Sequence, residues 1–451
     1  MNYSSNDTDT IAAIATAAGA ASVAIVRVSG SAALTIAKRL SGRTPRPRYA
    51  ELCVFSAADG EQIDSGLVLY FPAPASYTGE DVVEFHGHGG QVVTDWLLQS
   101  ACEMGARAAG PGEFTLRAFL NDKLDLTQAE SIADLIESRS RLASRAAIRS
   151  LNGRFSEQIA ALQSSLTDLR VSIEAWLNFP DEDLDLAASA ELGQRLDSVE
   201  QSLVALQAGA AQGAALADGL NIAIAGPPNA GKSSLLNRLA GYDAAIVTET
   251  PGTTRDVVKE RLLLDGLPVD VVDTAGLRAT TDPVEREGIK RAQQALPKAD
   301  HVLWLADFRD GLRSALASVD RELPAATDLT IVRNKVDLVR DQAALSESAG
   351  KTVVALSALT GEGVGLLIEH LKTLAGFSSE VAGAFSARRR HLDALARAQG
   401  HIAQARDELP RALEIAAEEL RAAQTALSEI TGELTSDDLL GEIFSSFCIG
   451  K

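Results

Sequence analysis

Apolar runs separated by glycine and polar turns recur through the first 120 residues. Short runs rich in β-branched residues predict three strands, at residues 24–28, 66–71 and 81–85. Apolar positions with helical spacing predict two helices, at residues 31–40 and 92–103. This mixture predicts a small α+β domain over residues 1–122.

The next stretch, residues 123–218, is predicted to be helical. Its apolar residues recur at alternating steps of four and three, the spacing of a coiled coil or helical bundle: Phe155, Ile159, Leu162, Leu166, Leu169, Ile173 and Trp176. Pro180 and the acids after it end that helix, and a second helix is expected over residues 190–208. We interpret the seam as ordinary bundle core without chemistry.

Residues 219–376 alternate strands and helices, which predicts a doubly wound α/β domain. An apolar strand at residues 221–225 runs into Gly226-Pro-Pro-Asn-Ala-Gly-Lys-Ser233, and helical spacing follows directly. This is the P-loop pattern in its strand–loop–helix setting. Its backbone N–H groups can surround a phosphate, Lys232 can neutralise the β/γ charge, and the Ser233 hydroxyl can ligate Mg²⁺.

Further polar motifs in this domain point to guanine nucleotides. Asp273 ends an apolar strand and can reach the Mg²⁺ shell, the Gly276 N–H can sense a γ-phosphate, and Thr254 can offer a second hydroxyl to Mg²⁺. In Asn334-Lys-Val-Asp337, the Asp337 carboxylate can accept two hydrogen bonds from guanine N1 and N2, and Lys335 can lie over the purine. The backbone of Ser357-Ala358 can contact the guanine O6. In this order, the motifs resemble a Ras-like, translation-factor-related GTPase domain.

One position departs from the Ras-like pattern. Leu277 stands where those enzymes carry the glutamine that orients the attacking water, and an apolar side chain cannot do so. Asp282, Glu285 and Glu287 lie nearby, and their spacing does not choose among them. The alternative is that all three simply solvate a switch loop, so the sequence leaves the water-positioning group open.

Composition narrows the range of partners and compartments. The net charge of −19 argues against a protein that coats nucleic acid, so an RNA partner would be met by local patches or by a second protein. Three widely spaced cysteines favour a reducing cytosol. The apolar run at residues 11–26 is too short to span a membrane. His86 and His88 could ligate a metal, but a glycine-rich turn is the preferred interpretation of that stretch.

Residues 377–451 are again predicted to be helical. Helical stretches therefore flank the GTPase domain in sequence, which predicts that this domain is inserted into one discontinuous helical domain. The chain ends in Phe444-Ser-Ser-Phe-Cys-Ile-Gly-Lys451.

The chain resembles the MnmE (TrmE) family of tRNA-modification GTPases over essentially its whole length. The resemblance rests on this ending, on the P-loop and on residues 111–125, 252–256, 273–278 and 284–286. The family implies an N-terminal tetrahydrofolate-binding fold that also forms a homodimer. It implies a partner, the FAD-bearing protein MnmG (GidA). Together the two proteins add an aminomethyl or carboxymethylaminomethyl group to C5 of the wobble uridine of certain tRNAs in the cytoplasm. A 5-formyl- or methylene-tetrahydrofolate supplies the one-carbon unit.

The resemblance also assigns roles to residues. Folate binding falls to Arg27, Glu84, Lys123 and Lys451, and Cys448 matches a cysteine needed for modification. The resemblance assigns Ser233 and Thr254 as Mg²⁺ ligands. It assigns as K⁺ ligands Asn229, Thr248, Thr250 and Thr253. Glu285 matches the acid that positions water, while K⁺ performs the task of an arginine finger.

Motifs and resemblance together give one nucleotide-binding set: Asn229, Ala230, Gly231, Lys232, Ser233, Ser234, Thr248, Glu249, Thr250, Pro251, Gly252, Thr253, Thr254, Asp273, Thr274, Ala275, Gly276, Asn334, Lys335, Asp337, Ser357, Ala358 and Leu359. Two alternatives remain. A ribosome-assembly GTPase of the Era or Der type shares the apolar residue after its switch motif, although such proteins end in a basic RNA-binding domain. A helical scaffold whose GTPase domain only regulates assembly is the other.

Overall fold

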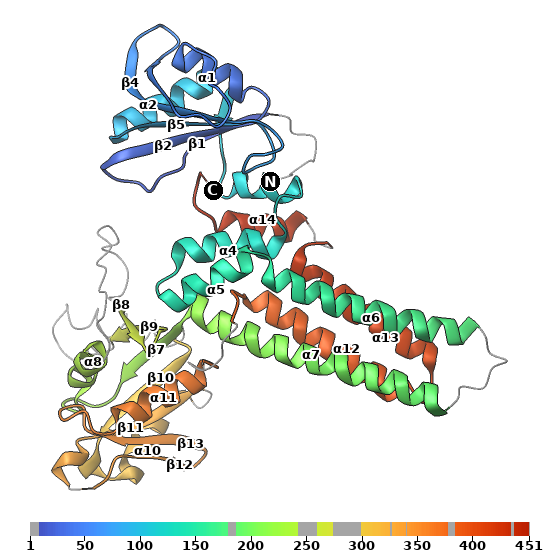
Figure 1. The fold of residues 1–451 in the computed structure, drawn as a ribbon. Coiled ribbons are helices and arrows are strands. Elements are labelled where there is room, and N and C mark those ends of the chain that lie inside the picture. The colour runs from blue at the N-terminus through green and yellow to red at the C-terminus, as the bar shows by residue number, and fades with distance from the viewer. Residues whose placement is uncertain are drawn as a thin grey trace. The chain divides into compact units, whose positions relative to one another are not determined.

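The structure is a computed structural model that describes all of the chain except residues 1–8, 179–185, 242–258, 274–298, 325–326, 340, 378–383, 434–436 and 451 (Figure 1). It divides into two compact units. The first comprises Met1–Ala133, Ser150–Gly193 and Arg397–Lys451, and the second comprises Asp134–Arg149 and Gln194–Ala396.

The first unit contains a sheet in the order β3-β4-β5-β2-β1-β6. Its strands are β1 (Thr10–Ile14), β2 (Ala21–Ser29), β3 (Glu51–Ser56), β4 (Gln62–Phe71), β5 (Val82–Gly89) and β6 (Ala106–Ala108). Helices α1 (Ala33–Ser41) and α2 (Gln91–Glu103) contribute to a core in which Phe55 and Phe85 meet edge to face, with ring centroids 5.4 Å apart. The predicted α+β character and all three predicted strands are confirmed here.

The predicted glycine-rich turn around His86 and His88 is wrong, because β5 continues as a strand to Gly89. His86 pairs with β2 on one side and with β4 on the other. The glycines allow close approach of the neighbouring backbones. A Cβ at Gly66 would lie 2.1 Å from the His86 carbonyl oxygen, and one at Gly89 would lie 2.4 Å from that of Ala21.

The remaining helices outside the two sheets range from short to long. They are α3 (Glu113–Leu120), α4 (Leu126–Glu137), α5 (Arg141–Leu151), α6 (Arg154–Asn178), α7 (Leu186–Asp218), α12 (Arg389–Glu408), α13 (Leu413–Thr431) and α14 (Asp437–Ser445). Helices α4, α5, α7 and α12 each have residues in both units. The predicted apolar seam lies on α6, and all of its members are buried except Trp176, which is half-buried. Helix α6 packs against α13 from the far end of the sequence (Figure 1).

Helix α7 is longer at both ends than the predicted helix over residues 190–208. Its second half contains Gly209 and Gly213, which lie beyond the predicted end of the helix. Both glycines instead face Phe385, and a Cβ at Gly213 would lie 1.7 Å from the Phe385 carbonyl oxygen. The glycines therefore permit the backbone around Phe385 to pack closely against α7.

The second unit contains a sheet in the order β12-β13-β11-β10-β7-β9-β8. Its strands are β7 (Leu220–Ala225), β8 (Lys259–Leu264), β9 (Leu267–Asp273), β10 (His301–Asp307), β11 (Leu329–Asn334), β12 (Ala344–Ser348) and β13 (Lys351–Leu356). The central strands are parallel, and the edge strands β8 and β12 are antiparallel to their neighbours.

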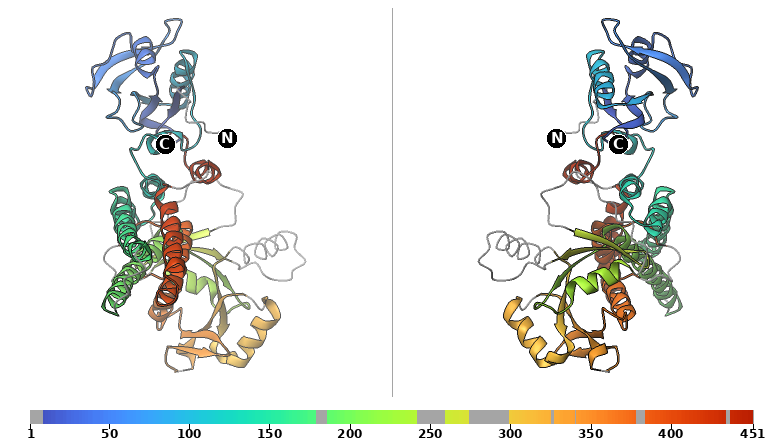
Figure 2. Two further views of the ribbon diagram at one scale, coloured as in Figure 1. Left: turned by 90° about the vertical axis from the view of Figure 1, so that its right-hand side faces the viewer. Right: turned by 90° about the vertical axis from the view of Figure 1, so that its left-hand side faces the viewer.

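Helices lie on both faces of this sheet (Figure 2). They are α8 (Lys232–Ala240), α10 (Leu312–Glu322) and α11 (Val364–Leu374), with short 3₁₀ turns at Phe308–Asp310 and Val336–Leu338. Ile222 and Ile224 of β7 share a core with α8 and α11, while Ala223 and Ala225 share another with α10. This alternation is typical of the predicted doubly wound fold. Within the described residues, no helix is both long and apolar enough to cross a membrane.

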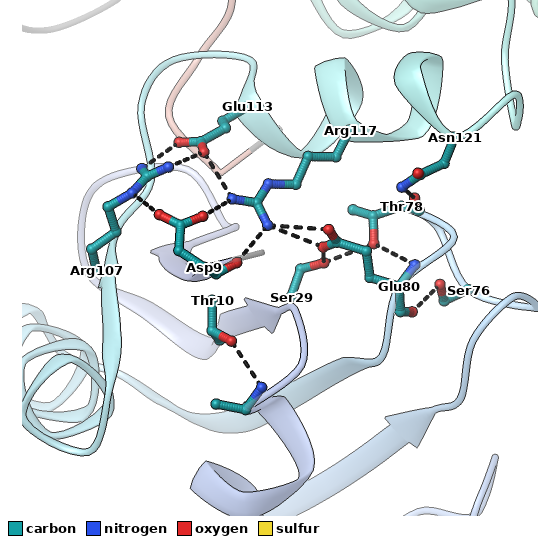
Figure 3. Close-up of polar contacts among 11 residues, drawn as sticks. Asp9, Thr10, Ser29, Ser76, Thr78, Glu80, Arg107, Glu113, Arg117 and Asn121 are labelled. Carbon is teal, nitrogen blue, oxygen red and sulfur yellow. Dashed lines mark hydrogen bonds and ion pairs between the residues drawn. The ribbon is translucent and has the colours of Figure 1, made fainter. Parts of the chain in front are cut away.

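A network of charges centred on the buried side chains of Arg117 and Glu113 joins α3 to the first sheet (Figure 3). The Arg117 guanidinium donates to an Asp9 carboxylate oxygen at 2.6 Å and to both oxygens of Glu80 at 3.2 Å. Arg107 donates to both oxygens of Glu113, at 2.8 and 2.6 Å. The Ser29 hydroxyl donates to Glu80 at 2.6 Å. Burial alone would raise the pKa of Glu113, but Arg107, the Gly110 N–H and Arg117 together outweigh it, so that pKa is lowered. The charges are therefore mutually compensated.

We expect Arg117→Leu to destabilise this region strongly. Removing one member of a buried ion pair costs about 3–5 kcal/mol, because its partners keep an uncompensated charge. Native-state hydrogen exchange of β1 and α3 should show that loss, with exchange in the second unit unchanged. As a control, Arg154→Leu breaks an exposed pair with Glu157, which is worth about 0–1 kcal/mol. Wild-type protection in Arg117→Leu would contradict the prediction.

Two histidines share one hydroxyl within the second unit. Thr330 Oγ1 lies 2.8 Å from Nε2 of His301 and 2.8 Å from Nε2 of His370. Burial, with a smaller effect of His370, lowers the pKa of His301 from 6.5 to about 4. Burial also lowers the pKa of His370. The folded unit therefore favours neutral imidazoles.

These shifts predict acid sensitivity of the second unit. In the unfolded chain His301 takes up a proton near pH 6.5, whereas in the folded unit it does so only near pH 4. The contribution of neutral His301 to the free energy of unfolding is therefore full above pH 6.5 and is lost as the pH falls from 6.5 toward 4. Hydrogen exchange of β10 and β11 at pH 7.5 and pH 5, corrected for intrinsic rates, would measure the loss. His301→Gln should weaken the pH dependence. An equal pH dependence in this variant and the wild type would refute the assignment.

Candidate functional site

The P-loop lies at the carboxyl end of β7 and connects this strand to α8. Gly226 and Gly231 have φ of +134° and +99°, in a region that favours glycine. A Cβ at Gly226 would lie 2.1 Å from the Leu305 carbonyl oxygen, and one at Gly231 would lie 2.2 Å from Nδ2 of Asn334. Both glycines are thus required by close contacts with neighbouring strands.

The buried side chain of Asn334 joins three loops at this edge of the sheet. Its Nδ2 donates to the Ala230 carbonyl at 2.8 Å. Its Oδ1 accepts from the backbone N–H of Lys335 at 2.8 Å and from that of Ala358 at 2.9 Å. The predicted P-loop, Asn-Lys-Val-Asp and Ser-Ala-Leu segments are therefore brought together.

Lys335 connects the same loops by a second route. Its ammonium group donates to the Asn229 carbonyl at 2.7 Å and to the Asp307 carboxylate at 2.9 Å. Hydrogen bonds from Arg309, together with Lys335, outweigh burial and hold the pKa of Asp307 far below its usual range. Sequence reasoning missed Asp307. Its position at the end of β10, next to β11 with Asn334 at its end, could have indicated it.

Asp337 has a free acceptor at this site. Its Oδ1 atom is buried and has no hydrogen-bond partner among the residues that the structure describes. A buried unpaired carboxylate oxygen is costly, and a ligand with N–H donors would satisfy it. This chemistry fits the N1 and N2 groups of guanine.

The first turn of α8 carries the predicted phosphate-binding residues. The Lys232 ammonium donates to the carbonyls of Gly226 at 2.7 Å and Pro227 at 2.9 Å. Ser233 and Ser234 are exposed beside it, and so is Leu359 on the loop after β13. Asp273 ends β9.

Several predicted site residues lie outside the described residues. For the nucleotide and cations they are Thr248, Glu249, Thr250, Pro251, Gly252, Thr253, Thr254, Thr274, Ala275, Gly276 and Glu285. For folate, Lys451 is the one outside. Their predicted roles stay predictions.

In the first unit, Arg27 of β2 and Glu84 of β5 face each other in register. Arg27 Nη2 lies 2.9 Å from Glu84 Oε1, and His86 Nε2 lies 3.1 Å from Glu84 Oε2. Burial would raise the pKa of Glu84, but His86 and Arg27 outweigh it and lower that pKa. The guanidinium also lies over the rings of Tyr77 and Phe114, 5.3 and 5.7 Å from their centroids.

Lys123 extends from the end of α3 to the loop that carries Tyr77. Its ammonium group is exposed and donates to the Pro74 carbonyl at 3.1 Å. His88 pairs with Asp64. Within the described part of the chain, no cluster of three or more His, Cys, Asp or Glu side chains could hold a metal ion.

The end of the chain is held against the N-terminal sheet. The Gly112 N–H donates to the Cys448 carbonyl at 3.4 Å, and Ile449 bridges to Pro111. A Cβ at Gly450 would lie 2.4 Å from the Ile14 carbonyl oxygen. The Cys448 thiol is free, and the residue is exposed.

Comparisons with known proteins agree with the predicted resemblance. A profile described as "MnmE helical domain" matches residues 126–448, and one described as "GTP-binding protein TrmE N-terminus" matches residues 10–123. The chain is 53% identical to "tRNA modification GTPase MnmE" of Nitrosococcus oceani, covering 98% of this chain and 97% of that one. It is 52% identical to the protein of that name from Laribacter hongkongensis over 100% of both chains.

A solved structure of Era from Aquifex aeolicus is also similar, at 24% identity over 40% of this chain and 66% of that one. Its TM-score of 0.27 supports no structural argument. Because the MnmE relatives match from end to end, the Era or Der alternative is not favoured. The chain belongs to the MnmE family of tRNA-modification GTPases.

Proposed function

We propose that the protein is a K⁺-stimulated GTPase that works with an FAD-containing partner, MnmG, on tRNA. Together they add an aminomethyl or carboxymethylaminomethyl group to C5 of the wobble uridine, using a tetrahydrofolate one-carbon unit. The observation that carries the proposal is a guanine-type site, held together by Asn334, in a chain that matches tRNA-modification GTPases from end to end.

In this proposal the described residues bind the nucleotide as follows. Lys232 exchanges neutral carbonyl acceptors for β- and γ-phosphate oxygens, which are stronger partners for an ammonium group. Asp337 accepts from the guanine, and Lys335 lies beside the base. Ser233 and Thr254 would hold Mg²⁺, which neutralises phosphate charge.

K⁺ would be held by Asn229, with Thr248, Thr250 and Thr253. Asn229 is exposed and has φ of +60°, while Lys335 binds its carbonyl. Its backbone is therefore fixed while its amide oxygen, a ligand type suited to hard cations, stays accessible. A cation there supplies positive charge beside the phosphates. Glu285 would position the attacking water.

GTP turnover in KCl and in NaCl, at equal ionic strength, tests this site. K⁺ should accelerate hydrolysis, and Asn229→Ala should abolish most of that acceleration while GDP affinity is retained. Glu285→Ala should reduce turnover about 10²- to 10⁴-fold, the range of a positioned acid or base. Leu338→Ala, at an exposed position in the same unit, is a control. Equal wild-type rates in the two salts would remove the K⁺ mechanism.

The proposed folate site is built around the Arg27–Glu84 pair. A carboxylate can accept from the amino and ring N–H groups of a pterin, and His86 and Arg27 lower the pKa of Glu84, which favours the ionised acceptor. Lys123 binds the Pro74 carbonyl of the loop that also carries Tyr77. The tail supports a role for Lys451, because Gly450 contacts Ile14, which pairs with Val26, the residue before Arg27.

Binding of 5-formyl-tetrahydrofolate, measured by calorimetry, tests this site. Glu84→Gln keeps the shape of the side chain but loses the charged acceptor. We therefore expect the affinity for the folate to fall about tenfold or more, as for the loss of one charge-assisted hydrogen bond. Asp64→Asn, in the adjacent strand and paired with His88, is a matched control. Unchanged affinity in Glu84→Gln would disprove the assignment, and GTP turnover should stay normal.

The remaining assignments extend the same proposal. We propose domains at residues 1–122, 123–218, 219–376 and 377–451, with the GTPase domain inserted in a discontinuous helical domain. Packing of α6 on α13 supports this, because these helices come from opposite sides of the insertion. We also propose a cytoplasmic homodimer formed through the N-terminal domain, and a role in modification for the exposed Cys448.

A further inference from the structure

Arg238 makes a contact that the nucleotide-binding motifs do not include. It lies on α8, and its guanidinium crosses to the loop after β13, 120 residues later. Nε donates to the Ala358 carbonyl at 3.1 Å, and Nη2 donates to the Leu359 carbonyl. A planar guanidinium can hold two acceptors in fixed directions.

Other contacts restrain this loop through its N–H groups. The Ser357 N–H donates to the Glu362 carbonyl at 2.8 Å, and the Thr360 N–H donates to Ser357 Oγ at 3.2 Å. The Ala358 N–H, predicted to meet guanine O6, donates to Asn334 at 2.9 Å. The next N–H on the loop is that of Leu359. Leu359 is 74% exposed, so packing of its side chain does little to orient this N–H group.

The geometry of the peptide bond links Arg238 to that N–H. The Ala358 carbonyl and the Leu359 N–H belong to one planar trans peptide, in which they point in opposite directions. When Arg238 holds the carbonyl on the α8 side, the Leu359 N–H must point away from α8. Rotation of this peptide would break the Arg238 bond.

We propose that Arg238 is a positioning residue for guanine recognition, which orients the Leu359 N–H toward the 6-oxo group of the base. The inference rests on the proposed assignment of the base site to Asp337. Arg238 does not touch the nucleotide in this proposal. Its effect should therefore depend on whether the base carries a 6-oxo group.

Calorimetric titration of the full-length protein tests this dependence. The ligands are GDP and 2-aminopurine riboside diphosphate, which keeps the 2-amino group but lacks both the 6-oxo group and the N1–H. The missing N1–H weakens binding of the analogue to every variant, so each variant is compared with the wild type for the same ligand. The variants are Arg238→Ala, Arg238→Lys and Asn237→Ala, the last an exposed neighbour on the same helix. Asp337→Asn independently tests the base site.

We expect Arg238→Ala to weaken GDP binding about three- to tenfold, as for a charge-assisted hydrogen bond at a partly exposed position, with less than about twofold change for the analogue. Arg238→Lys should recover part of the loss, and Asn237→Ala should match the wild type. Equal losses for both ligands, or no loss, would overturn the role of Arg238. Unchanged GDP affinity in Asp337→Asn would instead overturn the base-site assignment.

Discussion

The nucleotide site depends on one buried amide side chain. Asn334 donates to the P-loop and accepts from the N–H groups of Lys335 and Ala358, so the P-loop and two segments more than 100 residues later share one set of hydrogen bonds. The side chain is 3% exposed, and loss of either end would leave buried polar groups unpaired, which costs about 1–3 kcal/mol each. Gly231 follows from this constraint, because any Cβ there would collide with the Asn334 amide.

The parts of this site that could be predicted are those with a local physical signature. Positive φ at Gly226 and Gly231 requires glycine, and a parallel sheet brings the carboxyl ends of its strands to one edge. The P-loop and Asn334 were therefore visible in the sequence. Asp307 ends β10 at the same edge and carries the same signature, although its partner Lys335 lies 28 residues away. Arg238 could not be predicted, because its importance comes from a partner 120 residues away.

The first unit was harder to predict for the same reason. Its partly buried ion network joins Asp9, Glu80, Arg107, Glu113 and Arg117, and each of these alone looks like a solvated surface charge. The glycines of β5 suggested a turn because the sequence does not show how closely neighbouring strands approach. The contact between Gly450 and Ile14 has no signature in composition or periodicity. Only the family resemblance indicated that the tail returns to this domain.

Positively charged side chains bind backbone carbonyls throughout the nucleotide site, and these side chains differ in how freely they can change partners. Lys232 and Lys335 are flexible point charges, whereas the planar fork of Arg238 loses its geometry if either acceptor moves. Phosphate offers an ammonium group a stronger partner than a carbonyl does, so nucleotide binding favours redirection of Lys232. No such gain draws Arg238 from its loop. Lys232 at the phosphate end can thus exchange its partners, whereas Arg238 holds the loop after β13 in a fixed geometry.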